Sequence, residues 1–143
     1  MAVQHEAEVH LETCRGRSLA DRQACNIERR DFVRQCLLAR AGDLHGQRRV
    51  AHALGRRSDR NPLVSGVKAD PIQACAWRLI IITYASHLDA GPEDEMEERR
   101  DCALLSDAEH SSAQLRAAEL AVLIAQHPTP HPPREAELGS TGR

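Results

Sequence analysis

The longest apolar run of the chain lies between Gly66 and Ala85, where the sequence reads G-V-K-A-D-P-I-Q-A-C-A-W-R-L-I-I-I-T-Y-A. Asp70 followed by Pro71 is typical of a helix start, because a carboxylate accepts hydrogen bonds from first-turn amides and proline is tolerated at the first helical position. From Pro71 to about His87, apolar side chains occupy most positions on two faces. The pattern therefore predicts a helix that is buried over most of its circumference.

A buried β-strand over Leu79 to Tyr84 is the competing interpretation, because short runs rich in β-branched residues fit either element. An uninterrupted stretch of about 17 residues is too long for an ordinary strand, which has about five or six. We therefore expect a helix, with Trp77 in the core and with Gln73 and Arg78 left for solvent.

Helix-like spacing of apolar residues predicts five further helices. Ser18 with Asp21 and Ser106 with Glu109 have the spacing of capping boxes, and Asp43 is placed to cap the helix after Gly42. The expected helices cover residues 2–15, 19–41, 44–57, a short stretch from 92, and 106–126.

Two of these helices carry apolar stripes that should face the core. The second helix would bury Cys25, Phe32 and Cys36, with Val33 and Leu37 beside them. In the last helix the expected positions are Leu115, Ala118 and Val122, with Ala113, Ala117, Leu120 and Ile124 beside them.

Composition favours an all-α chain. The 143 residues include one Trp, one Tyr and one Phe, so the core must be built from aliphatic residues and cysteine. Alanine, leucine and helix-spaced charges suit helices better than a sheet. The basic residues are arginine except for Lys68, which we attribute to a GC-rich bacterial genome.

Charge differs between the two parts of the chain. Residues 1–60 hold 12 Arg against 8 acids, which gives +4, and residues 61–143 hold 7 basic against 13 acidic residues, which gives −6. This asymmetry falls short of a nucleic-acid footprint, although it suits a charged partner.

The location predicted from the sequence is cytoplasmic. No hydrophobic segment reaches the roughly 20 residues needed to span a bilayer, and the start M-A-V-Q-H-E lacks the features of a signal peptide. A periplasmic location would require an upstream start with a signal. In a reducing compartment the five cysteines would be free thiols that serve as small apolar side chains.

Residues 39–91 resemble one Sel-one-like repeat, a relative of the tetratricopeptide repeat. The family pattern has Gly-Asp before its first helix, Ala-Gln and Leu-Gly-x-x-Tyr within it, and Gly-Val-x-x-Asp with Ala-x-x-Trp in the second. The matching positions are Gly42, Asp43, Gln47, Gly66, Val67, Asp70, Ala74 and Trp77. The departures are Val50-Ala51 for Leu-Gly, Leu54 for the tyrosine, Gly46 for an alanine, and a longer loop from Ser58 to Ser65.

The resemblance implies a short α-solenoid of helical hairpins that acts as a non-catalytic scaffold for protein contacts. Its parts would be N-terminal capping helices (1–41), the repeat (42–91), a C-terminal helical hairpin (92–126) and a disordered Pro-rich tail (127–143). A single repeat cannot bury its own faces, so the flanking helices cap it or the chain forms a homodimer. The polar face of the first repeat helix would contact an acidic protein partner through His45, Arg48, Arg49, His52 and Arg56.

Metal binding, nucleic-acid binding and catalysis are less well supported by the sequence. His10 and Cys14 have helical metal-ligand spacing, with Cys25 or Cys36 to complete the set, but no C-x-x-C pair occurs and no metal or cofactor is expected. Residues 47–60 resemble a helix-turn-helix and offer a basic nucleic-acid face, although Pro62 interrupts the would-be recognition helix. The motifs of phosphate loops, nucleophile elbows and zinc proteases are absent from the sequence, so no catalytic residue is assigned.

Some secreted members of the Sel-one-like family staple the helices of a repeat with disulfides. Cys25 and Cys36 would lie about 16 Å apart along one helix, too far to bond with each other. A disulfide of either would need a partner on another helix, such as Cys75 or Cys102.

Overall fold

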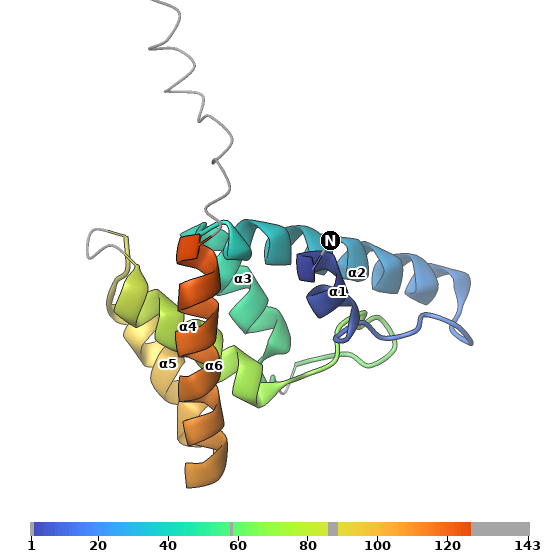
Figure 1. Ribbon diagram of the computed structural model, residues 1–143. Coiled ribbons are helices and arrows are strands. Elements are labelled where there is room, and N and C mark those ends of the chain that lie inside the picture. The colour runs from blue at the N-terminus through green and yellow to red at the C-terminus, as the bar shows by residue number, and fades with distance from the viewer. Residues whose placement is uncertain (1, 58, 86–88, 127–143) are drawn as a thin grey trace, which may run out of the picture.

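The computed structural model describes residues 2–57, 59–85 and 89–126, and this part of the chain is all-α (Figure 1). It contains no β-strand, and its one isolated antiparallel bridge joins Leu11 to Val67. The helices are α1 (Ala2–Glu8), α2 (Leu19–Arg40), α3 (Leu44–Leu54), α4 (Pro71–Tyr84), α5 (Pro92–Ala103) and α6 (Asp107–Gln126).

The expected helix starts are confirmed. Ser18, Asp43 and Asp70 each accept, through the side chain, a hydrogen bond from the backbone N–H three residues later, at 3.2, 2.7 and 3.2 Å. Ser106 and Glu109 form a reciprocal capping box, with N–H to side-chain oxygen distances of 2.9 and 3.2 Å. These bonds satisfy first-turn amides that have no partner inside the helix.

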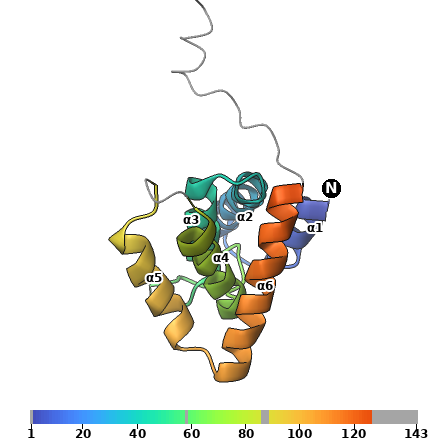
Figure 2. The same cartoon turned by 60° about the vertical axis from the view of Figure 1, so that its left-hand side comes forward.

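Helix α4 is the centre of the fold, because it packs against α3, α5 and α6 (Figure 2). Trp77 is 6% exposed, while Ile80 and Ile81 are 1% and 0% exposed. The run that resembled a strand is therefore a buried helix, and the expected core position of Trp77 is confirmed.

Close helix contacts explain two of the residues in the repeat-like segment. A β-carbon on Gly46 would lie 2.8 Å from the Cβ of Leu38, so α3 approaches α2 only because this position has no side chain. Next to it, Gln47 is buried and its Nε2 donates to the backbone oxygen of Ala39 at 3.2 Å. Both residues fix the angle at which α3 leaves the end of α2.

Two disulfides cross-link the chain, so the expectation of five free thiols is wrong. Cys14 bonds to Cys25, and Cys75 on α4 bonds to Cys102 on α5. Cys25 therefore pairs with neither Cys75 nor Cys102, the partners suggested for it from the sequence. Cys36 is free and buried.

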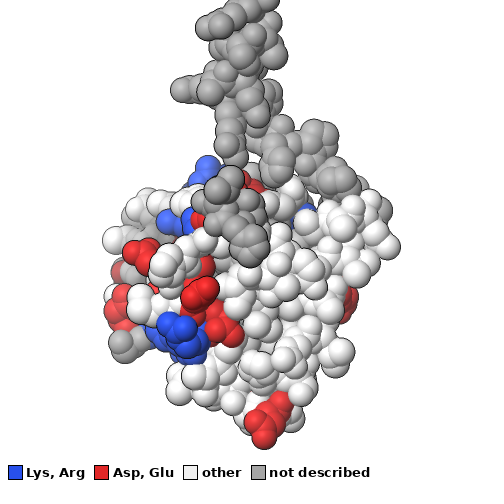
Figure 3. Space-filling model, turned by 90° about the vertical axis from the view of Figure 1, so that its left-hand side faces the viewer, with Lys and Arg blue, Asp and Glu red and all other residues white. Residues whose placement is uncertain are grey.

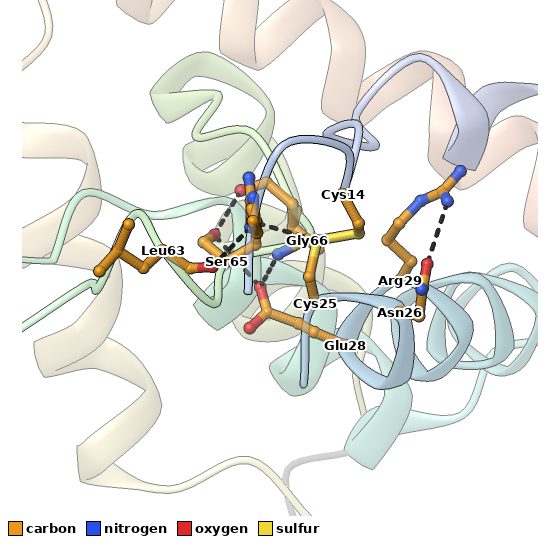
Figure 4. The surroundings of a disulfide bond; sticks show 10 residues. Cys14, Cys25, Asn26, Glu28, Arg29, Leu63, Ser65 and Gly66 are labelled. Carbon is orange, nitrogen blue, oxygen red and sulfur yellow. Dashed lines mark hydrogen bonds between the residues drawn. A yellow bond between two sulfur atoms is a disulfide. The ribbon is translucent and has the colours of Figure 1, made fainter. Parts of the chain in front are cut away.

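The Cys14–Cys25 disulfide lies beside Ser65 and Gly66, in the loop that precedes α4 (Figure 4). Oε1 of Glu28 accepts from the N–H of Gly66 at 3.2 Å, and a β-carbon on Gly66 would overlap the backbone oxygen of Cys25. Glycine is therefore required here by the close approach of the loop to α2. Together these contacts attach both the segment after α1 and the loop before α4 to the start of α2.

Several sequence-based expectations about helix ends and faces are wrong. The first helix ends at Glu8 rather than residue 15, because residues after it turn away to the bridge with Val67. In α4, Arg78 is 4% exposed instead of facing solvent, while Tyr84 is 60% exposed. The tyrosine lies in the last turn of α4, where it lines an open pocket with Leu44 and Ile124.

Helix α6 buries only one of the two apolar stripes expected to face the core. Leu115 and Val122 are 74% and 53% exposed, whereas Ala113, Ala117 and Leu120 are buried. The small alanines allow α6 to lie close to α4, so the larger side chains of the other stripe are left outside. The Pro-rich tail at 127–143 lies outside the described residues. Within the described residues, no helix is both long and apolar enough to cross a bilayer.

Candidate interaction surface on helix α3

The exposed face of α3 lies between α2 and α5. Its buried face contains Val50, Ala51 and Leu54. Of the residues predicted to contact a partner, His45, Arg49 and His52 are exposed on the opposite face and Arg48 is partly buried there. Arg56 is exposed as well, but it follows the end of α3 at Leu54 and lines a pocket with Pro71 and Arg100.

Arg48 is engaged within the chain. Its Nε and Nη2 donate to the two carboxylate oxygens of Asp94 at 2.9 and 2.7 Å, and Nη2 also donates to the backbone oxygen of Asp89 at 2.8 Å. Asp94 is 5% exposed and also accepts from the N–H of Gly91 at the start of α5. The hydrogen bonds from Arg48 lower the pKa of Asp94 and burial raises it. The first effect is the larger, so the pKa of Asp94 lies below its usual range. Arg48 thus joins α3 to α5 and has few donors left for a partner.

Arg49 faces α2. Its Nη2 lies 3.4 Å from Oδ2 of Asp31, and its side chain is 53% exposed. Burial opposes ionisation of Asp31, but hydrogen bonds from Arg34, Gln35 and Arg49 hold the pKa of Asp31 below its usual range. The exposure and the long contact leave most of the Arg49 guanidinium accessible.

A shallow pocket of about 290 Å³ follows the groove between α2 and α3. Acidic side chains come from α2 and basic ones from α3 and the segment after it. Its lining residues that carry polar side chains are Glu28, Asp31, Gln35, Arg49, His52 and Arg57. The acids of α2 were not singled out from the sequence, although their spacing beside the Phe32 stripe places them on the side of α2 that faces α3.

His52 is paired with Arg57, whose Nη1 lies 2.5 Å from the His52 Nε2. Burial, followed by the positive charge of Arg57, lowers the pKa of His52. The neutral ring accepts a hydrogen bond from the guanidinium in this arrangement. His52 therefore contributes an uncharged surface at neutral pH.

The basic residues of segment 47–60 do not form one free cluster. Arg60 donates to the backbone oxygens of Val67 at 2.8 Å and Gly55 at 3.0 Å, so it holds the loop before α4 in place. With Arg48 also engaged and Arg57 partly buried against His52, the exposed cations of this segment are Arg49 and Arg56. Among the described residues after α3 the next helix begins at Pro71, so no recognition helix is seen in residues 55–57 and 59–70.

The metal set considered from the sequence is not assembled. Cys14 is bonded to Cys25. The rings of His10 and Phe32 pack edge to face with their centroids 6.1 Å apart, and Nδ1 of His10 lies 3.8 Å from Oδ2 of Asp70. The remaining thiol, Cys36, is buried, and burial raises its pKa to about 12. Cys14, Cys25 and His10 therefore have partners within the protein, and no common metal site joins them to Cys36.

The outer side of α4 and α6 is nearly uncharged. Figure 3 views the side formed by α4, α5 and α6, where charged residues gather over α5 and a large area beside them carries none. In α4 the one charged residue is Arg78, which is buried, and the segment from Leu120 to Gln126 of α6 has no charge. The charged residues of α6, which are Asp107, Glu109, Arg116 and Glu119, therefore all precede this uncharged segment.

Comparison with protein-family models, with curated proteins and with solved structures finds no match for this chain. The functional conclusion depends on the chain's own residues. What the α3 face offers is a set of accessible donors on a rigid helix. Its two neighbours, α2 and α5, supply acids that hold part of that set in place.

Proposed function

We propose that this protein is a non-catalytic scaffold of the Sel-one-like repeat type that binds an acidic segment of a partner protein through α3. The observation that carries the proposal is that Arg49 and His52 are exposed on one face of α3, with Arg56 exposed two residues after its end, while the opposite face packs into the core. A rigid helix that presents several donors can recognise an acidic peptide with little ordering of its own side chains.

The repeat assignment is supported by physical roles at the matching positions. Gly66 permits the loop to touch α2, Trp77 is buried in the centre, and Asp43 and Asp70 cap the two repeat helices. The helices before and after the repeat cover its faces, as a chain with one repeat requires.

The test is binding of a fluorescent acidic peptide, read by anisotropy. An R49E/R56E double variant should weaken binding at least about tenfold, because opposite charges become like charges. The matched control is R22E/R30E, which changes the net charge equally on the exposed side of α2. Equal loss in both variants, or no binding of acidic peptides over neutral ones, would contradict the proposal.

Nucleic-acid binding through residues 47–60 is the alternative. It is supported by the positive charge of the N-terminal part and opposed by the engagement of Arg48 and Arg60. An electrophoretic shift at two salt concentrations separates the two functions, because phosphate contacts lose affinity steeply as salt rises. The absence of a shift at low salt removes this alternative.

The compartment in which the scaffold works is also part of the proposal. Disulfides persist in oxidising compartments, whereas the cytoplasm, which the sequence predicts, keeps thiols reduced. Rapid alkylation of the chain in its native host, followed by mass measurement, distinguishes these locations. Five alkylated cysteines support the cytoplasm and one supports an oxidising compartment.

A further inference from the structure

Three helices bring two sulfur atoms and an imidazole together near the centre of the C-terminal half. Cys75 lies on α4, Cys102 near the end of α5, and His110 in the first turns of α6. The two Sγ atoms and a ring nitrogen of His110 all lie within 4.8 Å of one another. The cysteines are 0% and 5% exposed, and His110 is partly buried at the edge.

We propose that the chain in which the Cys75–Cys102 disulfide is reduced binds a zinc ion through Cys75, Cys102 and His110. A dithiol reductant supplies two electrons and two protons, which break the S–S bond and give two thiols, while the dithiol becomes a disulfide. Zinc then binds the two sulfurs as thiolates, and two protons are released to water. The imidazole binds as the neutral ring through one nitrogen.

The distances fit a tetrahedral site. With Zn–S bonds of about 2.3 Å, two ligand atoms of a tetrahedron are about 3.8 Å apart. The three ligand atoms already lie within 4.8 Å of one another, and the Cα atoms of the two cysteines are 5.0 Å apart. Rotation of the side chains therefore allows the site to form without moving the helices apart.

The ligand types select zinc. Thiolates favour soft or borderline metals, and imidazole suits zinc, whereas calcium and magnesium require oxygen ligands. The acids next in sequence to the ligands are already engaged: Asp101 accepts from Arg78 at 2.9 Å, and Glu109 accepts from the N–H of Ser106. The fourth coordination position of the zinc ion is therefore left to a water molecule. This water would enter from the side of the site where His110 is partly exposed.

The same two sulfurs thus support the fold in either redox condition. As a disulfide they join α4 to α5. As zinc ligands they would join α4, α5 and also α6, since His110 belongs to the third helix. In a reducing compartment cysteine sets of this kind more often bind metal than form disulfides.

The test uses the full chain, reduced under nitrogen and titrated with Co²⁺, whose thiolate charge-transfer absorption reports sulfur ligation. We expect one equivalent to bind to the reduced chain and none to the oxidised chain, and we expect Zn²⁺ to displace it. H110A should weaken Co²⁺ binding at least about 100-fold, since loss of a ligand exceeds the ~10–100-fold effect of disturbing an outer partner. C102S should abolish the absorption.

The matched controls are H45A, which removes an exposed imidazole on α3, and C14S, which removes a thiol of the other disulfide; both should bind Co²⁺ as the parent does. Circular dichroism of the reduced chain with and without Zn²⁺ monitors folding. The proposal is overturned if the folded reduced chain shows no thiolate absorption, or if H110A and H45A behave alike. It is equally overturned if reduction unfolds the helices and one equivalent of Zn²⁺ does not restore them.

Discussion

Arg78 and Asp101 form an ion pair inside the protein, with 2.9 Å between Nε of the arginine and Oδ2 of the aspartate and with each side chain 5% exposed. The pair joins α4 to α5 next to the Cys75–Cys102 disulfide. Glu97 adds a second carboxylate 3.8 Å from the same guanidinium. Two charges so deeply buried depend on each other, because either one alone would be left in an apolar environment.

Replacing Arg78 should therefore destabilise the fold strongly. We expect R78L to lower the free energy of unfolding by about 3–5 kcal/mol, because it leaves a buried carboxylate without its partner. Urea denaturation measures the change. R99L, on the exposed side of α5, should stay within about 0.5 kcal/mol of the parent. Similar stabilities of the two variants would show that Arg78 is not buried.

Trp77 should be a major source of core stability. Truncation in W77A is expected to cost about 3–5 kcal/mol, because the cavity left in the centre of α4 cannot collapse fully. Thermal unfolding followed by circular dichroism checks the value, with Y84A at the exposed end of the same helix as the control. If W77A melts at the temperature of the parent, α4 is not the buried centre of the fold.

Arg48 and Arg49 should respond differently to charge reversal. R48E places two carboxylates side by side and should cost about 2 kcal/mol, less than a fully buried pair because the Arg48 side chain is 38% exposed. R49E should change stability by less than about 0.5 kcal/mol, since this side chain is largely in solvent. Their urea midpoints provide the comparison. Equal midpoints would mean that the Asp94 contact contributes nothing.

The thiol count of the oxidised chain is a direct check on the cross-links. Alkylation in denaturant without reductant should add one label, at Cys36, because the other four cysteines are bonded. In the folded chain Cys36 should react slowly, since burial raises the pKa of its thiol to about 12. Intact mass and peptide mapping give the answer. Three or five labels in protein purified under air would contradict the two disulfides.

Stability should fall on mild acidification. Burial lowers the pKa of His10, with Asp70 acting in the opposite direction. Between the folded pKa and the ordinary value of 6.5 the unfolded chain binds more protons, so stability is full above that value and is lost as the pH falls below it. Urea midpoints at about pH 7.5 and about pH 5.5 lie on either side of it. H10Q should reduce the difference between them, whereas H5Q, at an exposed position, should leave it unchanged.

The features that local sequence determines were predicted well. Caps at Asp43 and Asp70 depend on residues three positions apart, and the burial of α4 follows from an apolar run that no surface helix would carry. The sequence did not decide between the two apolar stripes of α6, because both have helical spacing. Packing decides between them: small alanines let α6 approach α4, and no periodicity contains that information.

The contacts made across long sequence separations could not be predicted. Arg48 and Asp94 are 46 residues apart, and Arg78 and Asp101 are 23 residues apart, so neither partner is indicated by its neighbours. Four of the five proposed contact residues lie on α3 and the fifth, Arg56, follows its end, and the use of Arg48 inside the chain reduces the accessible set. Disulfide connectivity likewise cannot be deduced from cysteine spacing.

The central position of α4 has a consequence for the architecture. In a long solenoid each unit touches only its neighbours, so units can be added or removed at will. Here three helices enclose α4 from different directions, and one of those contacts is cross-linked covalently. These helices are its own hairpin partner α3 and the two helices of the next hairpin, so the contacts stay between neighbouring units, and the disulfide fixes those two units to each other.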